Sequence, residues 1–221
     1  MLLKANLHFH TKDDPQDKIE YSFYEAIDLA AKYNYKVIAL TLHKKFGYTD
    51  EYSQYAHKKG ILLIPGIELT IMKKHVLVLN CKKDIESVIT FESLAAYKER
   101  HPDIFIIAPH PYHLQSFCLG KRLLQHIDLF DAIEHSWFFS DYFNPNLKAG
   151  SVAKTNGLPF IATSDTHFLE YADAGYCKIE CQESSISSIL ESLRVGKFQN
   201  YINPRKTPDL IRIYAKYFIL L

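Results

Sequence analysis

The sequence has little of several features that would point to particular classes of protein. Its 221 residues carry a formal net charge of only +1, so we expect no tight binding to long duplex DNA, which requires a strongly basic surface. An apolar run of about 18 residues, long enough to cross a membrane, does not occur, and Lys4 interrupts the start of the chain. These absences predict a protein without a membrane span or a secretory signal.

Cysteine is another scarce residue, and no two cysteines form a CxxC pair. The four in the chain are Cys81, Cys118, Cys177 and Cys181. The last two alternate with polar neighbours, as on the inward face of a strand. Such cysteines usually behave as small buried hydrophobic side chains, so we expect all of them to be buried and reduced. A reduced state in turn indicates a cytoplasmic location.

Hydrophobic residues are plentiful, at 48% of the chain, and no repeat, low-complexity tract or linker divides it. Apolar runs of strand length alternate with helical segments, which predicts βα units and a mainly parallel sheet in one domain, residues 1–221. About seven such units can close into a barrel. The expected strands are residues 2–9, 37–42, 61–67, 76–79, 103–108, 129–133, 159–163 and 175–181. The expected helices are residues 23–33, opened by a capping box of Ser22 and Glu25, 50–59, 84–100, 121–127, 144–156, 185–196 and 207–219.

Polar side chains that can bind a cation follow most of these apolar runs. His8 and His10 lie two residues apart at the end of the first run, so on a strand both side chains project from one face. Functional residues of barrels gather at the carboxyl ends of the strands, and we therefore expect the residues at the run ends to lie together. They are His8, His10, His43, Glu68, His110, Glu134 and Asp165.

The donor set becomes larger when His75, His167 and an acid from the loop after His10 are added. It consists of imidazoles and carboxylates without thiolates, which suits zinc, manganese or iron. The set is too large for one ion, so we expect two or three divalent transition metals about 3–4 Å apart. Clustered metals stabilise both oxygens of a phosphoryl displacement and lower the pKa of a bridging water, which indicates phosphate ester hydrolysis.

Six motifs, in their order along the chain, resemble those of the PHP-type phosphoesterases, the polymerase and histidinol phosphatase superfamily. They are His8-Phe9-His10, Leu42-His43, Gly66-Ile67-Glu68, His75-Val76-Leu77, Ala108-Pro109-His110-Pro111 and Ser164-Asp165-Thr166-His167. The resemblance runs from the first strand to about residue 200. It implies an α/β fold, a distorted (β/α)7 TIM-like barrel with a trinuclear metal site at its C-terminal mouth.

The resemblance also implies roles for individual residues. A metal-bridging hydroxide would attack phosphorus, with Glu68, Asp165 and His43 as the catalytic candidates. The implied ligands are His8, His10, Glu68 and Asp165 for the first metal, Glu68, His75 and His110 for the second, and His43, His167 and the loop acid for the third.

Two departures from the family pattern concern the third metal. The family usually has an aspartate before the histidine of its second motif, where this chain has Leu42, and residues 13–17 replace its Ser-Asp-Gly loop. Counting residues back from the end of the following helix, at Asn34, favours Asp17 over Asp14 as the loop ligand, and both remain candidates. An acid that holds a ligand histidine raises its metal affinity, and Leu42 cannot do this for His43. We therefore expect the third site to be the weakest.

The sequence indicates the substrate less clearly than the metal ligands. Lys44 and Arg122 are candidates for binding it by charge, and His113 and His135 by their positions close after strand ends. The aromatic stretch 137–143 fits a stacking wall for a base, a packing corner or an oligomer contact. The small net charge favours a small phosphorylated substrate, either a phosphomonoester or a nucleotide.

Two other functions fit part of the pattern. An HxH motif with a late aspartate also occurs in amidohydrolases, which hydrolyse C–N bonds, but a bridging lysine would favour that class and this chain has Glu68 instead. A PHP module that has become structural or regulatory is the second alternative. Lost ligands would indicate such a module, and here the set is nearly complete.

Overall fold

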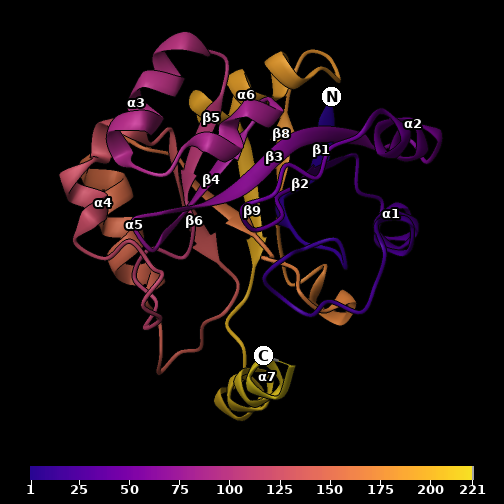
Figure 1. Cartoon of the computed structure of the whole chain (residues 1–221). Helices are drawn as coiled ribbons and strands as arrows, with labels where there is room; N and C mark the ends of the chain where they lie inside the picture. Colours follow the sequence, from indigo (N-terminus) through magenta and orange to yellow (C-terminus); the bar gives the residue numbers. More distant parts are fainter. Residues whose placement is uncertain (221) are drawn as a thin grey trace.

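The strands of the molecule form one twisted sheet that curves into a barrel (Figure 1). The computed structural model describes residues 1–220, with side chains described as far as Lys216. Within these residues the sheet has nine strands in the order β7-β6-β5-β4-β3-β2-β1-β8-β9. Their bounds are β1 (Leu2–Phe9), β2 (Val37–Leu40), β3 (Leu62–Ile71), β4 (Lys74–Leu79), β5 (Phe105–Ala108), β6 (Ala132–Ser136), β7 (Phe160–Thr163), β8 (Gly175–Glu180) and β9 (Phe198–Ile202).

The helices pack mainly around the outside of the barrel, with α1 and α2 on one side and α3, α4 and α5 on the other (Figure 1). The expected capping box at Ser22 is confirmed, because its hydroxyl accepts from the Glu25 N–H and the Glu25 carboxylate accepts from the Ser22 N–H. The bounds are α1 (Phe23–Lys32), α2 (Asp50–Lys58), α3 (Phe91–Arg100), α4 (Arg122–Gln125), α5 (Asn146–Thr155), α6 (Ile186–Arg194) and α7 (Thr207–Leu220), with 3-10 turns η1 (Lys83–Ser87), η2 (Ile127–Leu129) and η3 (Leu169–Tyr171).

Strand β1 contacts the segment that follows β7, and this contact nearly closes the sheet. The Thr166 N–H donates to the His8 carbonyl at 3.3 Å, and the His10 N–H donates to the Thr166 carbonyl at 3.2 Å. A parallel bridge between Phe9 and Thr166 results. The expected barrel is therefore confirmed, as a nearly closed sheet.

Two strands depart from the expected parallel order. The β4 strand runs antiparallel to both β3 and β5, and β8 runs antiparallel to β1 and β9. Met72 and Lys73 join β3 to β4 with φ of 48° and 66°, the positive values of a tight hairpin turn. Because neither residue is glycine or asparagine, the sequence did not reveal this turn.

Several expected boundaries were also wrong. Strand β3 continues through Glu68 to Ile71 instead of ending before Glu68. The expected helix 84–100 is divided into η1 and α3, because Thr90 caps a new helix through the Ser93 N–H. Strand β9 was not expected at all, since residues 198–202 lack the apolar alternation of a core strand.

The apolar interior of the barrel lies between the strands and α6. Every strand from β1 to β8 contributes side chains to this cluster, and Ile189, Leu190 and Leu193 of α6 pack against it. Separate clusters fill the space beneath α1 and α2 and beneath α3, α4 and α5. All four cysteines are buried and free, as expected.

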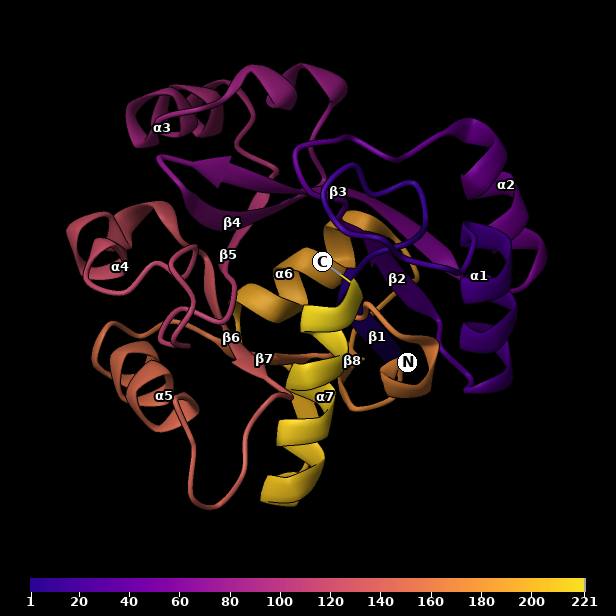
Figure 2. The ribbon, with the colours of Figure 1, turned by 60° about the horizontal axis from the view of Figure 1, so that its bottom comes forward.

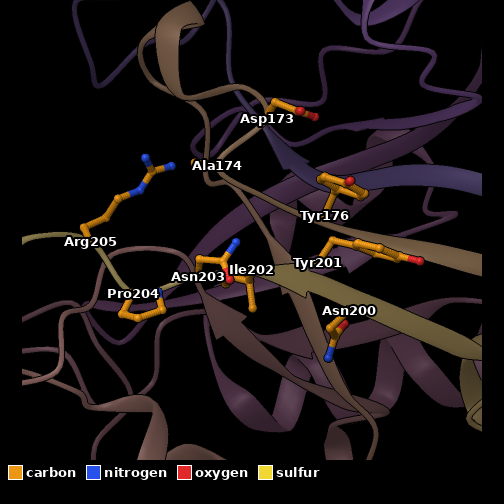
Figure 3. Close-up of a pocket in the computed structure, with 9 residues that line it drawn as sticks. All are labelled: Asp173, Ala174, Tyr176, Asn200, Tyr201, Ile202, Asn203, Pro204 and Arg205. Atoms are coloured by element: carbon orange, nitrogen blue, oxygen red, sulfur yellow. The ribbon is translucent and has the colours of Figure 1, made fainter.

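Two further features bear on where function can reside. Among the described helices, none combines the length and apolar character needed to cross a bilayer. A cavity of about 450 Å³ lies beside β8 and β9, where Tyr176 stacks on Tyr201 and Arg205 approaches from the loop before α7 (Figure 3). Its lining includes none of the expected metal ligands.

Candidate metal centre

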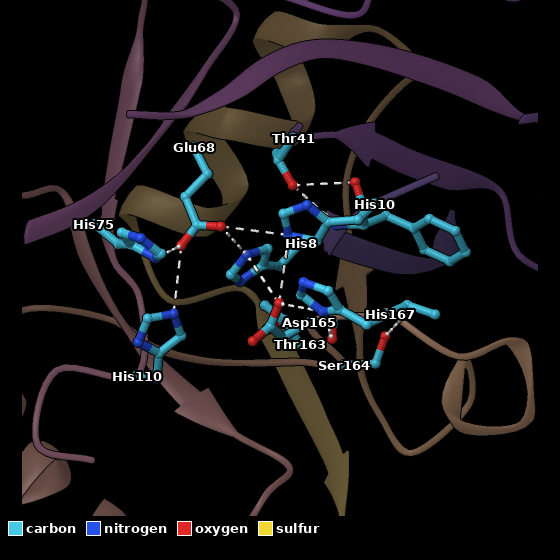
Figure 4. A network of polar contacts seen from close by, with 12 residues as sticks. His8, His10, Thr41, Glu68, His75, His110, Thr163, Ser164, Asp165 and His167 are labelled. Carbon is cyan, nitrogen blue, oxygen red and sulfur yellow. Dashed lines mark hydrogen bonds and ion pairs between the residues drawn. The ribbon is translucent and has the colours of Figure 1, made fainter. Parts of the chain in front are cut away.

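The expected ligands meet at the carboxyl ends of the parallel strands (Figure 4). His8 is the second-last residue of strand β1. His43, His110 and Asp165 lie in the segments after β2, β5 and β7. Glu68 reaches the same place from the middle of β3, because this strand extends beyond the end of β2 to pair with β4. The site is thus assembled from most strands of the barrel.

Glu68 occupies the middle of the cluster. Its Oε2 atom lies 3.1 Å from His8 Nε2, 3.3 Å from His10 Nε2 and 3.0 Å from His43 Nε2. The side chain is fully buried. One carboxylate oxygen therefore faces three imidazoles that come from two different strand ends.

The other oxygen of Glu68 faces a second group of imidazoles. Its Oε1 atom lies 2.8 Å from His75 Nδ1 and 3.3 Å from His110 Nε2. Neither Glu68 Oε1 nor His75 Nδ1 makes a hydrogen bond of acceptable geometry, although both are buried. Buried polar atoms that approach closely without bonding are expected where both point toward a cation.

Asp165 completes a compact group of donors with the two histidines of β1. Its Oδ1 atom lies 3.2 Å from His8 Nε2 and 3.4 Å from His10 Nε2. One atom from each of His8, His10, Glu68 and Asp165 lies within 4.8 Å of the others. This spacing fits one cation bound by two imidazoles and two carboxylates.

The two loop acids have different environments. Asp14 is buried, and its Oδ2 accepts from His10 Nδ1 at 2.9 Å, His43 Nδ1 at 3.0 Å and the His43 N–H at 2.8 Å. Asp17 lines the cavity, and its Oδ2 lies 2.8 Å from His167 Nε2. Asp14 thus holds histidines in place from behind, while Asp17 faces the open side with His167.

Glu134 also belongs to the site, although its place in the sequence indicated no particular role. Its carboxylate is fully buried and accepts from His8 Nδ1 at 2.8 Å and from the His110 N–H at 2.5 Å. Thr163 also donates to it. A carboxylate on the far nitrogen of a ligand histidine fixes its tautomer and raises its basicity, and the position of Glu134 after an apolar run was the available signal.

The electrostatics of the cluster favour positive charge. Burial lowers the pKa of His8, but the carboxylates of Asp165, Glu68 and Glu134 outweigh it and raise this pKa to about 9. Burial likewise opposes the charge of His43, yet Glu68 and Asp14 raise its pKa to about 10. A buried pocket that attracts protons this strongly also attracts metal cations.

The carboxylates are correspondingly held in their ionised form. Burial alone would raise the pKa of Glu68, but the histidines around it, led by His75 and His43, hold it well below its usual range. Burial also opposes ionisation of Asp165, and His8 and His167 lower its pKa strongly. Both acids are therefore available as anionic ligands at neutral pH.

Backbone strain is concentrated at the same strand ends. His110 has a φ of 29°, Asp165 of 41° and Lys44, beside His43, of 55°. Residues other than glycine rarely adopt such angles, which cost on the order of 1–3 kcal/mol each and cluster at functional sites. The fold therefore tolerates strain in order to aim these side chains.

The donors open onto a cavity of about 390 Å³. His113, one of the four substrate candidates, lines it together with Phe117, Trp137 and Phe138. The other three substrate candidates do not line it. Lys44 is exposed, Arg122 bonds Gln125 within α4, and His135 stacks on Phe160 with ring centroids 4.5 Å apart.

Comparisons with known proteins place the fold. A family model described as PHP-associated matches residues 143–198. A two-domain protein from Bacteroides vulgatus, containing a predicted PHP-like metal-dependent phosphoesterase, is 20% identical with a TM-score of 0.71, over 98% of this chain and 70% of its own. PsfC from Pseudomonas syringae is 17% identical with a TM-score of 0.66, over 98% and 97%. The lesion-specific endonuclease PfuEndoQ from Pyrococcus furiosus is 13% identical with a TM-score of 0.66, over 97% and 66%.

The fold found in these comparisons is consistent with the cluster of possible metal ligands described above. The fold and the cluster define a barrel protein whose imidazoles and carboxylates could hold metal ions at the mouth. The PHP-associated model covers only residues 143–198, and the structural likenesses, at 13–20% identity, show a shared fold. No curated protein sequence matches the chain.

Proposed function

We propose that this protein is a metal-dependent hydrolase of phosphate esters. The position of Glu68 carries the proposal, because its two oxygens face separate groups of imidazoles at 2.8–3.3 Å. A carboxylate placed in this way suits a bridge between two metals. The substrate would be a small phosphomonoester or a phosphodiester in a nucleotide or oligonucleotide.

The donors divide into three proposed metal sites, and zinc, manganese or iron fits them. Unpaired buried atoms of His10, Glu68, His75 and Asp165 support this division. The proposed ligands are His8, His10, Glu68 and Asp165 for the first site, Glu68, His75 and His110 for the second, and His43, His167 and Asp17 for the third.

The chemistry divides between the metals and the protein. Bound divalent metals would supply a water of lowered pKa and the charge that neutralises a phosphate. Glu68 and Asp165 hold the anionic charge that concentrates cations here. His43 and His167 line the cavity, where they would hold the third metal, and its charge would stabilise a departing oxygen.

The composition of the cavity supports a small substrate over a long nucleic acid. Its described lining residues include no lysine or arginine, whereas binding to a nucleic acid backbone depends on such side chains. The structurally similar endonuclease from Pyrococcus furiosus is lesion-specific, so cleavage at a nucleotide within DNA is the second candidate. A bridging lysine, which would favour an amidohydrolase, is missing from the same described lining.

Substitution of the two central carboxylates tests the proposal. In protein loaded with manganese or zinc, Glu68→Gln and Asp165→Asn should each reduce turnover of an aryl phosphate by on the order of 10²–10³. Glu99→Gln, which changes an exposed acid of α3, is the matched control and should retain the activity. Near-normal turnover in either site variant, with metal retained, would refute the assignment.

A further inference from the structure

The cavity at the metal centre has two chemically different sides. One side carries the imidazoles and carboxylates, and the other is formed by flat aromatic side chains from three separate parts of the chain. Phe117 comes from the segment between β5 and α4, Trp137 and Phe138 follow β6, and Tyr214 lies on α7. The aromatic side is therefore assembled by the tertiary fold.

Phe117 joins the two sides. Its ring stacks on His75 with centroids 4.4 Å apart and planes 12° apart, and it meets His110 edge-on at 5.5 Å. Both histidines are proposed ligands of the second metal. An aromatic surface thus begins directly beside the place where the phosphate would bind.

Trp137 gives this wall a fixed position. The side chain is buried and stacks on Tyr171 with ring centroids 5.0 Å apart. The Arg205 guanidinium lies 5.4 Å from the same indole, within the range of a cation–π contact. A wall that is already ordered loses little conformational entropy when a ligand stacks on it.

Helix α7 brings the last aromatic group across the mouth of the barrel. In Figure 2, which turns this end of the molecule forward, α7 lies in front of the strands. Leu210 and Ile213 anchor the helix, because their side chains are only 5% and 3% exposed. Ile213 packs against Trp137. Tyr214 lines the cavity and is 45% exposed.

We infer that the site takes phosphate esters whose leaving group is a flat aromatic ring, held between Tyr214 and Phe138, which packs edge-on against the buried Trp137. The inference rests on the proposed function and adds the substrate class to it. Stacking on a ring requires no charge, which agrees with the cavity lining of described residues without lysine or arginine. Two aromatic rings in offset or edge-on contact stabilise a complex by more than the burial of their apolar area alone.

The single tryptophan of the chain allows a direct test that needs no hydrolysis. Phenylphosphonate and ethylphosphonate, which resist hydrolysis, are titrated into metal-loaded protein while Trp137 fluorescence is recorded, and calorimetry gives the affinities. We expect phenylphosphonate to bind at least about ten-fold more tightly and to change the fluorescence at saturation, as stacking of one ring would produce. Equal affinities for the two phosphonates would overturn the inference.

Variants of α7 locate the effect. Tyr214→Leu, which retains apolar bulk without a flat ring, should abolish most of the preference for phenylphosphonate, and Tyr214→Phe should retain it. Ile211→Ala is the matched control, because Ile211 lies on the same helix, is 66% exposed and does not line the cavity. An unchanged preference in Tyr214→Leu would also overturn the inference.

The two proposals can fail separately. Preferential binding of phenylphosphonate without hydrolysis of phenyl or ethyl phosphate esters would refute the proposed function and leave the stacking site standing. Hydrolysis of both esters, with no difference in phosphonate affinity, would refute the stacking site alone.

Discussion

The carboxylate of Asp14 contacts two histidines that belong to different proposed metal sites. His10 Nδ1 and His43 Nδ1 both lie within 3.0 Å of its Oδ2 atom. The third site was expected to be weak because Leu42 stands where the resembled family pattern has an acid, yet Asp14 contacts His43 from the loop. The carboxylate also couples the first and third sites, since one group orients a ligand of each.

Replacing Asp14 therefore should weaken two metal sites at once. We expect Asp14→Asn to reduce metal affinity by about 10–100-fold at the sites of both His10 and His43. Asp17→Asn should affect only the site of His43 and His167. Metal content after dialysis against graded chelator measures both effects.

Asp13→Asn provides the control from the same loop. The carboxylate of Asp13 accepts from the Tyr52 hydroxyl at 2.7 Å and does not line the metal cavity. Loss of a single metal in Asp14→Asn would contradict the coupling of the two sites.

His135 makes a separate prediction about acid stability. Its burial lowers its pKa from the usual 6.5 to about 4, although Glu134 opposes the shift. Between these values the unfolded chain binds the proton and the folded protein does not, so this residue destabilises the fold as pH decreases from about 6.5 to 4. His135→Phe, which can keep the stacking on Phe160, should gain on the order of 1 kcal/mol over the wild type at pH 5 relative to pH 7.5.

Urea unfolding at the two pH values measures that difference. Free energies of unfolding that change in parallel in the variant and the wild type would show that His135 does not carry the effect. The comparison should be made in metal-free protein, because metal release at low pH changes stability for another reason.

At the scale of elements, the capping box of α1 has a measurable energetic role. Ser22→Ala removes the hydroxyl that accepts from the Glu25 N–H, and loss of such a cap costs about 1 kcal/mol. In a chain of this size that lowers the unfolding temperature by about 2–4 °C. Thermal unfolding followed by circular dichroism tests it, and Ser22→Asp, which restores an acceptor, should recover most of the loss.

The elements also show how much of the fold the sequence could predict. Apolar runs that are buried on both faces, such as β2 and β5, were located within a few residues because burial leaves a continuous pattern. The direction of β4 was missed, since strand direction depends on a turn whose residues, Met72 and Lys73, have no sequence signature. The edge strand β9 was missed because its exposed positions break the apolar pattern.

In the candidate site, the residues at strand ends could be predicted from the sequence, but the contributions of loops and of α7 could not. Residues that follow apolar runs, such as His43 and His110, could be recognised because a barrel brings strand ends together. The orienting role of Asp14 and the aromatic contribution of Tyr214 could not, since both depend on where a loop and a helix fold back over the mouth. Charge alone suggested Lys44 and Arg122 for the substrate, and neither lines the cavity.

At the scale of the whole molecule, metal binding should stabilise the fold. Ligands that bind only the folded state stabilise it by about 2.7 kcal/mol at a concentration of 100 times the Kd. Removal of the metals leaves buried carboxylates and imidazoles facing one another, as around Glu68. We expect a chelator to lower the unfolding temperature by several degrees, and re-addition of manganese or zinc to restore it in calorimetry.

The meeting of β1 with the segment after β7 gives the metals a mechanical role as well. This junction rests on the Phe9–Thr166 bridge, and it lies between His8 and His10 on one side and Asp165 and His167 on the other. A cation held by donors from both sides would link β1 to the segment after β7 and stabilise the closed barrel. Chains that have not acquired metal would then be the ones whose join opens most often, so that proteases encounter unloaded copies first. In this way the cofactor would determine which copies of the protein persist, in addition to which of them are active.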